Sequence, residues 1–153
     1  MQNGDLVADF SLPDQFGDAQ SLYRYLERGP VVLFFYPAAM TKGCTIECSH
    51  FRELKGEFEA LGAQRIGISR DAVGKQRKFS DLQGFDYSLL SDSRGIVAEQ
   101  FRVSRSFALL PVKRRTFVIG GDGRVVGIMK SEVRMNSHAD RALDLLRKLV
   151  SVK

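Results

Sequence analysis

The residues best suited to chemistry lie in the stretch FFYPAAMTKGCTIEC, which contains Cys44 and Cys48, the two cysteines of the chain. A cysteine thiolate is a strong nucleophile, and its sulfur can be oxidised and reduced again. Thr41 places a hydroxyl three residues before Cys44, where it can donate or accept a hydrogen bond. Gly43 lets the backbone approach a reacting group closely. The types and spacing of these residues indicate nucleophilic attack by sulfur, or redox chemistry at sulfur.

The composition limits the class of protein. A chain of 153 residues, of which 44% are hydrophobic, can bury one core without disulfides or metals, so we expect residues 1–153 to form a single domain. The N-terminal sequence lacks the features of a secretory signal, and no apolar run approaches the roughly 20 residues that span a membrane. We therefore expect a cytoplasmic protein without membrane association. Structural disulfides are uncommon in that compartment, where cysteines are most often buried as small hydrophobic residues.

The net charge of +5 raises the question of a nucleic-acid partner. The lysines and arginines are spread along the chain, and VKRRTF is the one local cluster. No basic stripe is interleaved with aromatic residues, and no DNA-binding motif is recognisable. The charge pattern argues against nucleic acid as a partner.

The elements that must position the cysteines follow from the spacing of apolar side chains. Strand 31–36 (VVLFFY) is β-branched and aromatic without alternation, as in a strand covered on both faces. From Thr45, apolar residues recur at helical spacing until Gly62, a favourable end for a helix. This order of elements predicts an α/β fold, in which a mixed sheet has helices on both faces. Further strands are predicted at 64–69 and 87–92, a hairpin at 115–130, and helices at 73–82, 94–101 and 138–150.

Cys44 falls at the junction between strand 31–36 and the first turn of the following helix. A thiolate in that position faces unpaired backbone N–H groups and the positive end of the helix dipole, and both stabilise negative charge. Pro37 makes the exit from the strand rigid. The predicted elements therefore favour the anionic, reactive form of Cys44.

The segment YPAAMTKGCT resembles the active-site motif of peroxiredoxins, Pro-x-x-x-Thr/Ser-x-x-Cys, with Pro37, Thr41 and Cys44 at the matching positions. The resemblance covers nearly the whole chain, because VADFSLPDQFG, LLSD and RRTFVIGGDGRVV also resemble segments of that family. Within the family, the chain is most similar to the Q-type, also called bacterioferritin comigratory protein. The resemblance implies a thioredoxin-like α/β fold, in which a central mixed sheet is flanked by helices and preceded by an N-terminal extension.

An activity and a set of site residues are also implied by the resemblance. A peroxiredoxin reduces hydrogen peroxide and organic hydroperoxides through a cysteine sulfenic acid, which would form at Cys44. Thr41 would hydrogen-bond the peroxide, and Pro37 would shield the sulfur from water. No metal or organic cofactor is implied, because the oxidation takes place on sulfur.

Arg114 matches the arginine that the family places two residues before the Thr/Ser of the late strand, here Thr116. Its guanidinium would stabilise the thiolate and polarise the peroxide, a task suited to a planar and permanently charged donor. Alternation along the strand also requires Arg114 and Arg115 to point to opposite faces, so at most one of them can face the site. We expect Arg115 on a solvated face.

Cys48 departs from the Q-type pattern, in which the resolving cysteine often lies one position further along the helix, where this chain has Ser49. Residues four apart in a helix have Cβ atoms ~5–6 Å apart, more than the ~3.8 Å of a relaxed disulfide, so a Cys44–Cys48 bond requires local unwinding. We expect Cys48 to resolve Cys44, because no other cysteine is available. The alternative is a one-cysteine enzyme that is resolved by an external thiol.

Two expectations about partners come from the family alone. The reductant would be thioredoxin or a glutaredoxin-like protein. The Q-type includes monomers and homodimers, and the sequence leaves both open. The loop 104–113 (SRSFALLPVK) is a candidate interface.

Two other classes of protein use similar residues. Cys44, Cys48 and His50 could bind a metal, but a closed zinc site usually has four ligands, and His138 is the only other histidine. A redox-sensing or chaperone-like protein could keep the fold without useful turnover.

Glu47 and Arg52 lie on the same predicted helix as the cysteines and could be mistaken for a catalytic acid and base. Peroxide reduction at sulfur needs only the cysteine and a proton source for the leaving hydroxide. We therefore expect both residues to be helix-surface charges or to form a structural ion pair.

Overall fold

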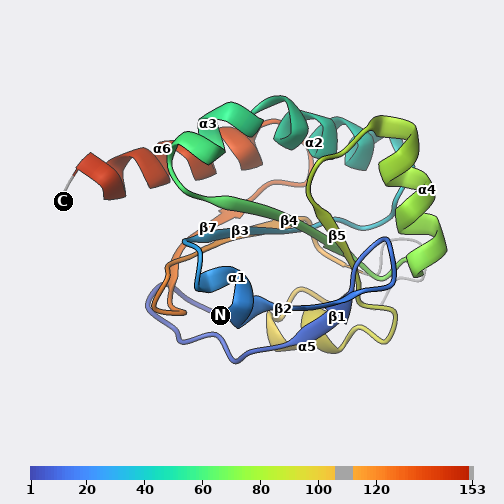
Figure 1. Cartoon of the computed structure of the whole chain (residues 1–153), viewed down its shortest axis with the longest axis horizontal. Coiled ribbons are helices and arrows are strands. Elements are labelled where there is room, and N and C mark those ends of the chain that lie inside the picture. Colours follow the sequence, from blue (N-terminus) through green and yellow to red (C-terminus); the bar gives the residue numbers. More distant parts are fainter. Residues whose placement is uncertain (106–111, 152–153) are drawn as a thin grey trace.

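The computed structural model describes residues 1–105 and 112–151, and its centre is a five-stranded mixed sheet (Figure 1). Three of its strands are parallel: β3 (Val31–Phe35), β4 (Gln64–Ser69) and β5 (Ser88–Ser91). The strand β6 (Arg115–Ile119) pairs antiparallel with both β3 and β7 (Val125–Lys130). The predicted α/β fold with a mixed sheet is confirmed. Most of the candidate interface 104–113 lies outside the described residues. The strand order across the sheet is β5, β4, β3, β6 and β7.

Helices cover both faces of this sheet, as Figure 1 shows. The N-terminal extension is a small hairpin followed by one short helix. None of the described helices is long and apolar enough to cross a membrane. The face drawn above the sheet carries α2 (Lys42–Glu53), α3 (Lys55–Ala60), α4 (Val73–Gln83) and α6 (Ser137–Ser151). The opposite face carries β1 (Ser11–Pro13), β2 (Ala19–Ser21), α1 (Leu22–Leu26) and α5 (Ile96–Gln100).

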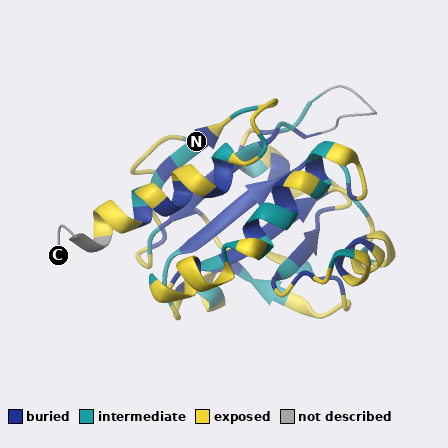
Figure 2. Ribbon diagram, turned by 90° about the horizontal axis from the view of Figure 1, so that it is seen from above, coloured by how far each residue is buried: buried dark blue, intermediate teal, exposed yellow. Residues whose placement is uncertain are grey.

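β3 is buried on both sides, which accounts for its continuous apolar sequence. Val32 and Phe34 belong to the apolar cluster under α2, α4 and α6, whereas Leu33 belongs to the cluster that α1 and α5 cover. The ring of Phe34 stacks on that of Phe51 from α2, with the ring centroids 4.0 Å apart. The buried strands are seen beneath the helices in Figure 2. The strand that leads to Cys44 is therefore held in the middle of the core.

Two differences from the predicted elements affect the site. α2 begins at Lys42, earlier than the predicted start at Thr45, so Cys44 lies within its first turn. The predicted helix 45–61 is divided into α2 and α3, because the backbone at Leu54 leaves helical geometry with φ −92° and ψ 19°. Gly62 follows α3 with a φ of 67°, as expected for a glycine that ends a helix.

Candidate active site

Cys44 lies in the first turn of α2, after the loop that follows β3. Thr41 precedes the helix with an extended backbone, and its carbonyl accepts the N–H of Thr45 at 2.9 Å. The Thr41 hydroxyl donates to the Ala38 carbonyl at 2.8 Å and does not cap the helix. The first amides of α2 can therefore stabilise negative charge near Cys44. The Cys44 side chain is 1% exposed, and Pro37 in the preceding loop is also buried.

Arg114 provides the positive charge nearest to Cys44. Its Nη2 donates to Cys44 Sγ at 3.4 Å, and its Nη1 donates to Glu47 Oε1 at 2.6 Å. Arg115, the next residue, points away and pairs instead with Glu132 at 3.2 Å. The side chain of Arg114 is 6% exposed and that of Arg115 is 21% exposed. The structure thus places Arg114 against the cysteine, and strand alternation directs Arg115 elsewhere.

Glu47 lies one turn after Cys44 and is fully buried. Of the two roles expected for it, the helix-surface charge is wrong and the ion pair is found, with Arg114 as the partner. Burial raises the pKa of Glu47 to about 7, although the charge of Arg114 acts in the opposite direction. The spacing of three residues from Cys44 predicts a shared helix face, but it does not predict that this face is buried.

His138, at the start of α6, closes the far side of the Glu47 carboxyl group. Its Nδ1 lies 3.7 Å from Glu47 Oε2, an oxygen without a hydrogen-bond partner. Its Nε2 lies 2.8 Å from the Ser131 carbonyl, which can only accept, so Nε2 carries the proton. Nδ1 then accepts a hydrogen bond from the Thr116 hydroxyl at 2.7 Å. Burial lowers the pKa of His138, which favours this neutral form.

Arg52 and His50, the other polar candidates on α2, make contacts elsewhere. Arg52 donates to the Gln83 carbonyl, and His50 Nε2 lies 2.7 Å from Asp140 Oδ1. Within residues 1–105 and 112–151, no three His, Cys, Asp or Glu side chains are grouped so that they could hold a metal ion.

Cys48 lies one turn beyond Cys44 and is fully buried in the apolar cluster. Burial raises the pKa of its thiol well above the usual value, and the charges of Glu47 and Cys44 raise it further. The Tyr87 hydroxyl donates to the Cys48 carbonyl at 2.6 Å. Both thiols are free in this structure. The burial of Cys48 in the core therefore favours its neutral thiol form.

Gly43 allows the close contacts at the start of α2. A Cβ atom at this position would lie 2.9 Å from Met135 Cε and 3.3 Å from Arg114 Nη2. Any larger residue would push one of these side chains away from the helix. Met40, in the loop before, has a φ of 65°, a left-handed conformation that is uncommon for residues other than glycine.

Comparison with known proteins shows the family to which this chain belongs. The AhpC/TSA family model matches residues 3–128. The chain belongs to this family. It is 32% identical to peroxiredoxin Bcp of Escherichia coli K12 over 152 residues, which cover 96% of each chain.

Two solved structures are similar to this peroxiredoxin along nearly its whole length. Peroxidoxin BcpB from Mycobacterium tuberculosis has 55% identity and a TM-score of 0.94, covering 97% of this chain and 98% of that one. The bacterioferritin comigratory protein of Xanthomonas campestris has 31% identity and a TM-score of 0.84, covering 92% and 91%.

The resemblance inferred from the motif is confirmed. The protein is a peroxiredoxin of the Bcp/PrxQ type, a thiol peroxidase with two cysteines, and its thioredoxin-like fold is also confirmed. The individual roles of Pro37, Thr41, Cys44, Cys48 and Arg114 stay predictions. Four of these five lie within a single stretch of the chain, and Arg114 reaches Cys44 from the position just before β6.

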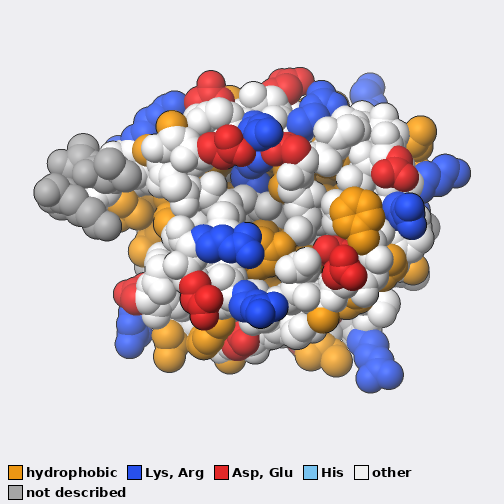
Figure 3. Space-filling model, viewed as in Figure 1, with side chains coloured by type: hydrophobic (Ala, Val, Ile, Leu, Met, Phe, Trp, Pro, Cys, Tyr) orange, Lys and Arg blue, Asp and Glu red, His pale blue; other side chains and the backbone are white. Residues whose placement is uncertain are grey.

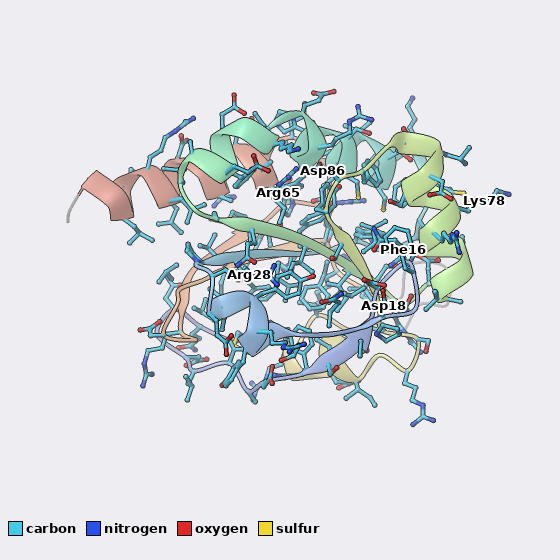
Figure 4. The ribbon with its side chains drawn as sticks, viewed as in Figure 1. Phe16, Asp18, Arg28, Arg65, Lys78 and Asp86 are labelled. Atoms are coloured by element: carbon cyan, nitrogen blue, oxygen red, sulfur yellow. The ribbon has the colours of Figure 1, made fainter. Side chains whose placement is uncertain are left out.

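A cavity of this peroxiredoxin lies away from the cysteines. It has a volume of about 580 Å³ and lies where β4 and β5 begin, whereas Cys44 follows the end of β3. Figure 4 shows Phe16, Arg28, Arg65 and Asp86 around it. The same face carries acidic and basic side chains side by side in Figure 3, without a large patch of one sign.

Proposed function

We propose that this peroxiredoxin reduces hydrogen peroxide and organic hydroperoxides at Cys44. The observation that carries the proposal is the contact of Arg114 Nη2 with Cys44 Sγ at 3.4 Å, made at the N-terminus of a helix. Two sources of positive potential, the guanidinium and the helix end, thus act on one sulfur atom. Organic hydroperoxides are included because the related Xanthomonas campestris structure is described in terms of alkyl peroxide reduction.

The reaction begins with attack of the Cys44 thiolate on the terminal oxygen of the peroxide. The O–O bond breaks as the S–O bond forms, so the sulfur is oxidised to a sulfenic acid, and the remaining oxygen leaves as water or an alcohol after it takes a proton. Negative charge moves from sulfur to the leaving oxygen in this step. Arg114 can stabilise this charge at both positions, because its planar guanidinium carries several N–H donors.

Thr41 and Pro37 have supporting roles in this proposal. The Thr41 hydroxyl already donates its hydrogen to Ala38, so its oxygen can accept a hydrogen bond from the peroxide. The buried Pro37 ring has no N–H group, and it shields the sulfur from water without adding a competing donor.

Cys48 is proposed as the resolving cysteine. Its thiol attacks the sulfenic sulfur, so that a Cys44–Cys48 disulfide forms and water leaves. Local unwinding of α2 is required, because side chains four residues apart on a helix are too far apart for a relaxed disulfide. Thioredoxin or a glutaredoxin-like protein in a reducing cytoplasm then restores both thiols.

Intact mass tests the proposal directly. Reduced wild type and Cys48→Ser are each treated with one equivalent of hydrogen peroxide. We expect the wild type to lose two hydrogens and the variant to gain one oxygen. Oxygen gain in both proteins would assign a one-cysteine mechanism, with Cys48 a packing residue. No mass change in either folded protein would contradict peroxide reduction at Cys44.

A further inference from the structure

The middle of α2 is held by a contact that ordinary helices lack. The Tyr87 hydroxyl donates to the backbone carbonyl of Cys48 at 2.6 Å. In a helix that carbonyl is already the acceptor for the N–H four residues later, so the hydroxyl is an additional partner. Tyr87 lies immediately before β5 and is only 7% exposed, and Cys48 is fully buried. The bond therefore ties the backbone of one cysteine to the sheet, out of reach of water.

A second contact holds the same helix one turn later. Arg65 Nη1 donates to the Phe51 carbonyl at 2.9 Å. This carbonyl is one of the last four of α2, which have no partner within the helix. Asp86 holds the Arg65 guanidinium through both carboxylate oxygens, at 3.1 and 2.5 Å, and Figure 4 shows the two side chains next to one another. The guanidinium also lies over the Tyr87 ring, 5.1 Å from its centroid, so the two anchors support each other.

We propose that Tyr87 is a positioning residue: its hydroxyl keeps α2 wound at Cys48 and thereby limits how fast Cys48 resolves an oxidised Cys44. This inference rests on the proposed function, in which the two sulfurs must meet. Unwinding at Cys48 breaks the hydrogen bond and leaves a buried hydroxyl without a partner, which makes the unwound form costly. The wound form is the one in which Cys44 is positioned against Arg114.

The chemistry of the step in which Cys48 resolves Cys44 shows why the Tyr87 hydrogen bond is important. Cys48 donates a thiol sulfur, the S–O bond of the Cys44 sulfenic acid breaks, an S–S bond forms, and the thiol proton leaves with the hydroxide as water. Burial raises the pKa of the Cys48 thiol, so the reactive thiolate is scarce while the helix stays wound. A sulfenic acid that waits for unwinding is exposed to a second peroxide, which oxidises it to sulfinic acid. The hydrogen bond from Tyr87 to the Cys48 carbonyl thus sets the balance between recycling of Cys44 and its irreversible oxidation.

Tyr87→Phe tests the proposal, because it removes one oxygen and keeps the packed ring. Tyr25→Phe is the matched control: its hydroxyl lies 2.7 Å from the Ser88 hydroxyl of β5 and does not touch α2. Reduced proteins are mixed with one equivalent of hydrogen peroxide and quenched at short times with a sulfenic-acid trap. Intact mass then gives the rate of sulfenic acid formation and the rate of disulfide formation separately.

We expect Tyr87→Phe to change the rate of disulfide formation and to leave the rate of sulfenic acid formation unchanged. Loss of one hydrogen bond should speed disulfide formation by about two- to tenfold in Tyr87→Phe, while sulfenic acid formation stays within the error of wild type. The share of sulfinic acid at high peroxide should fall in the same variant. Tyr25→Phe should match wild type in both rates. Unchanged disulfide formation in Tyr87→Phe, or an equal acceleration in Tyr25→Phe, would overturn the proposal.

A second measurement separates this proposal from the resolving role of Cys48. Hydrogen exchange of α2 amides in the reduced proteins reports unwinding without any peroxide. We expect faster exchange around Cys48 in Tyr87→Phe than in wild type or Tyr25→Phe. If wild type forms no Cys44–Cys48 disulfide, the resolving role fails. Unchanged exchange in Tyr87→Phe would overturn the proposal that Tyr87 keeps α2 wound, even if the disulfide forms normally.

Discussion

The two cysteines of α2 are equally buried and one turn apart, yet their surroundings differ in kind. Cys44 has a guanidinium at 3.4 Å and lies at the start of the helix. Cys48 has an aromatic and aliphatic surrounding, and its backbone carbonyl is tied to Tyr87. Burial alone therefore does not decide reactivity. The charge and the backbone donors around a buried thiol decide whether it is held ready to react or kept neutral in the core.

The largest effect is expected from exchanging the two cysteines for serine separately. Cys44→Ser should remove peroxide consumption entirely, because the nucleophile is lost. Cys48→Ser should consume one equivalent at the wild-type rate, because its thiol takes no part in the first step. The measurement is single-turnover loss of hydrogen peroxide. First-turnover consumption by Cys44→Ser would reverse the assignment of the two sulfurs.

Arg114→Lys should lower the rate constant for oxidation of Cys44 by about a hundredfold, because an ammonium cannot reproduce the planar set of donors. Arg115→Lys is the control: Arg115 pairs with Glu132 and does not reach the sulfur. Stopped-flow measurement of the oxidation rate at several peroxide concentrations compares the two variants. Equal losses in both would show that the contact of the Arg114 guanidinium with the sulfur is not responsible.

Glu47→Gln should change how stability depends on pH. The pKa of Glu47 is raised from 4.5 to about 7 in the folded protein, so the folded state holds this proton more tightly than the unfolded chain. The resulting stabilisation is complete below pH 4.5 and is lost as the pH rises through 7. Relative to Glu47→Gln, which cannot ionise, wild type should lose roughly 3 kcal/mol of unfolding free energy over this interval.

Urea denaturation at pH values across this interval measures the difference between the two proteins. His138 titrates in both of them, so its contribution largely cancels. Glu57→Gln, at an exposed position of α3, should keep the wild-type dependence. A parallel dependence in wild type and Glu47→Gln would mean that the buried carboxyl group remains ionised beside Arg114.

The smallest effect is expected at the two glycines of α2 and α3. Gly43→Ala should slow oxidation of Cys44 by about tenfold, because the added methyl group displaces Arg114 or Met135 by a few tenths of an ångström. Gly56→Ala, in open space on α3, should leave the rate unchanged and stabilise the protein by about 0.5–1 kcal/mol. Wild-type oxidation by Gly43→Ala would show that the Arg114 contact tolerates movement.

Local pattern was sufficient to predict the strand before the cysteine, because a strand covered on both faces shows a continuous apolar sequence. Pattern also predicted the helix that follows, but missed the interruption at Leu54, where one residue departs from helical geometry within an unbroken apolar repeat. The short N-terminal hairpin was missed in detail, because three-residue strands have too few positions to show a period.

The sequence by itself determined the spacing of Pro37, Thr41 and Cys44, and the strand-to-helix junction that supplies backbone N–H groups to the sulfur. Alternation also required that Arg114 and Arg115 point apart. Only the tertiary structure decided which side chains from distant parts of the chain contact the two cysteines. Arg114 meets Cys44 across 70 residues of chain, and the Tyr87 hydroxyl meets the Cys48 carbonyl across 39.

The reason is that side-chain periodicity reports which face of an element is buried, but not what covers that face. Glu47 shows this most clearly. Its place on the helix face of Cys44 could be read from a spacing of three residues. Its burial, its raised pKa and its partner depend on α6 and on the residue before β6, which lie against α2, and packing between distant segments is decided by the whole core.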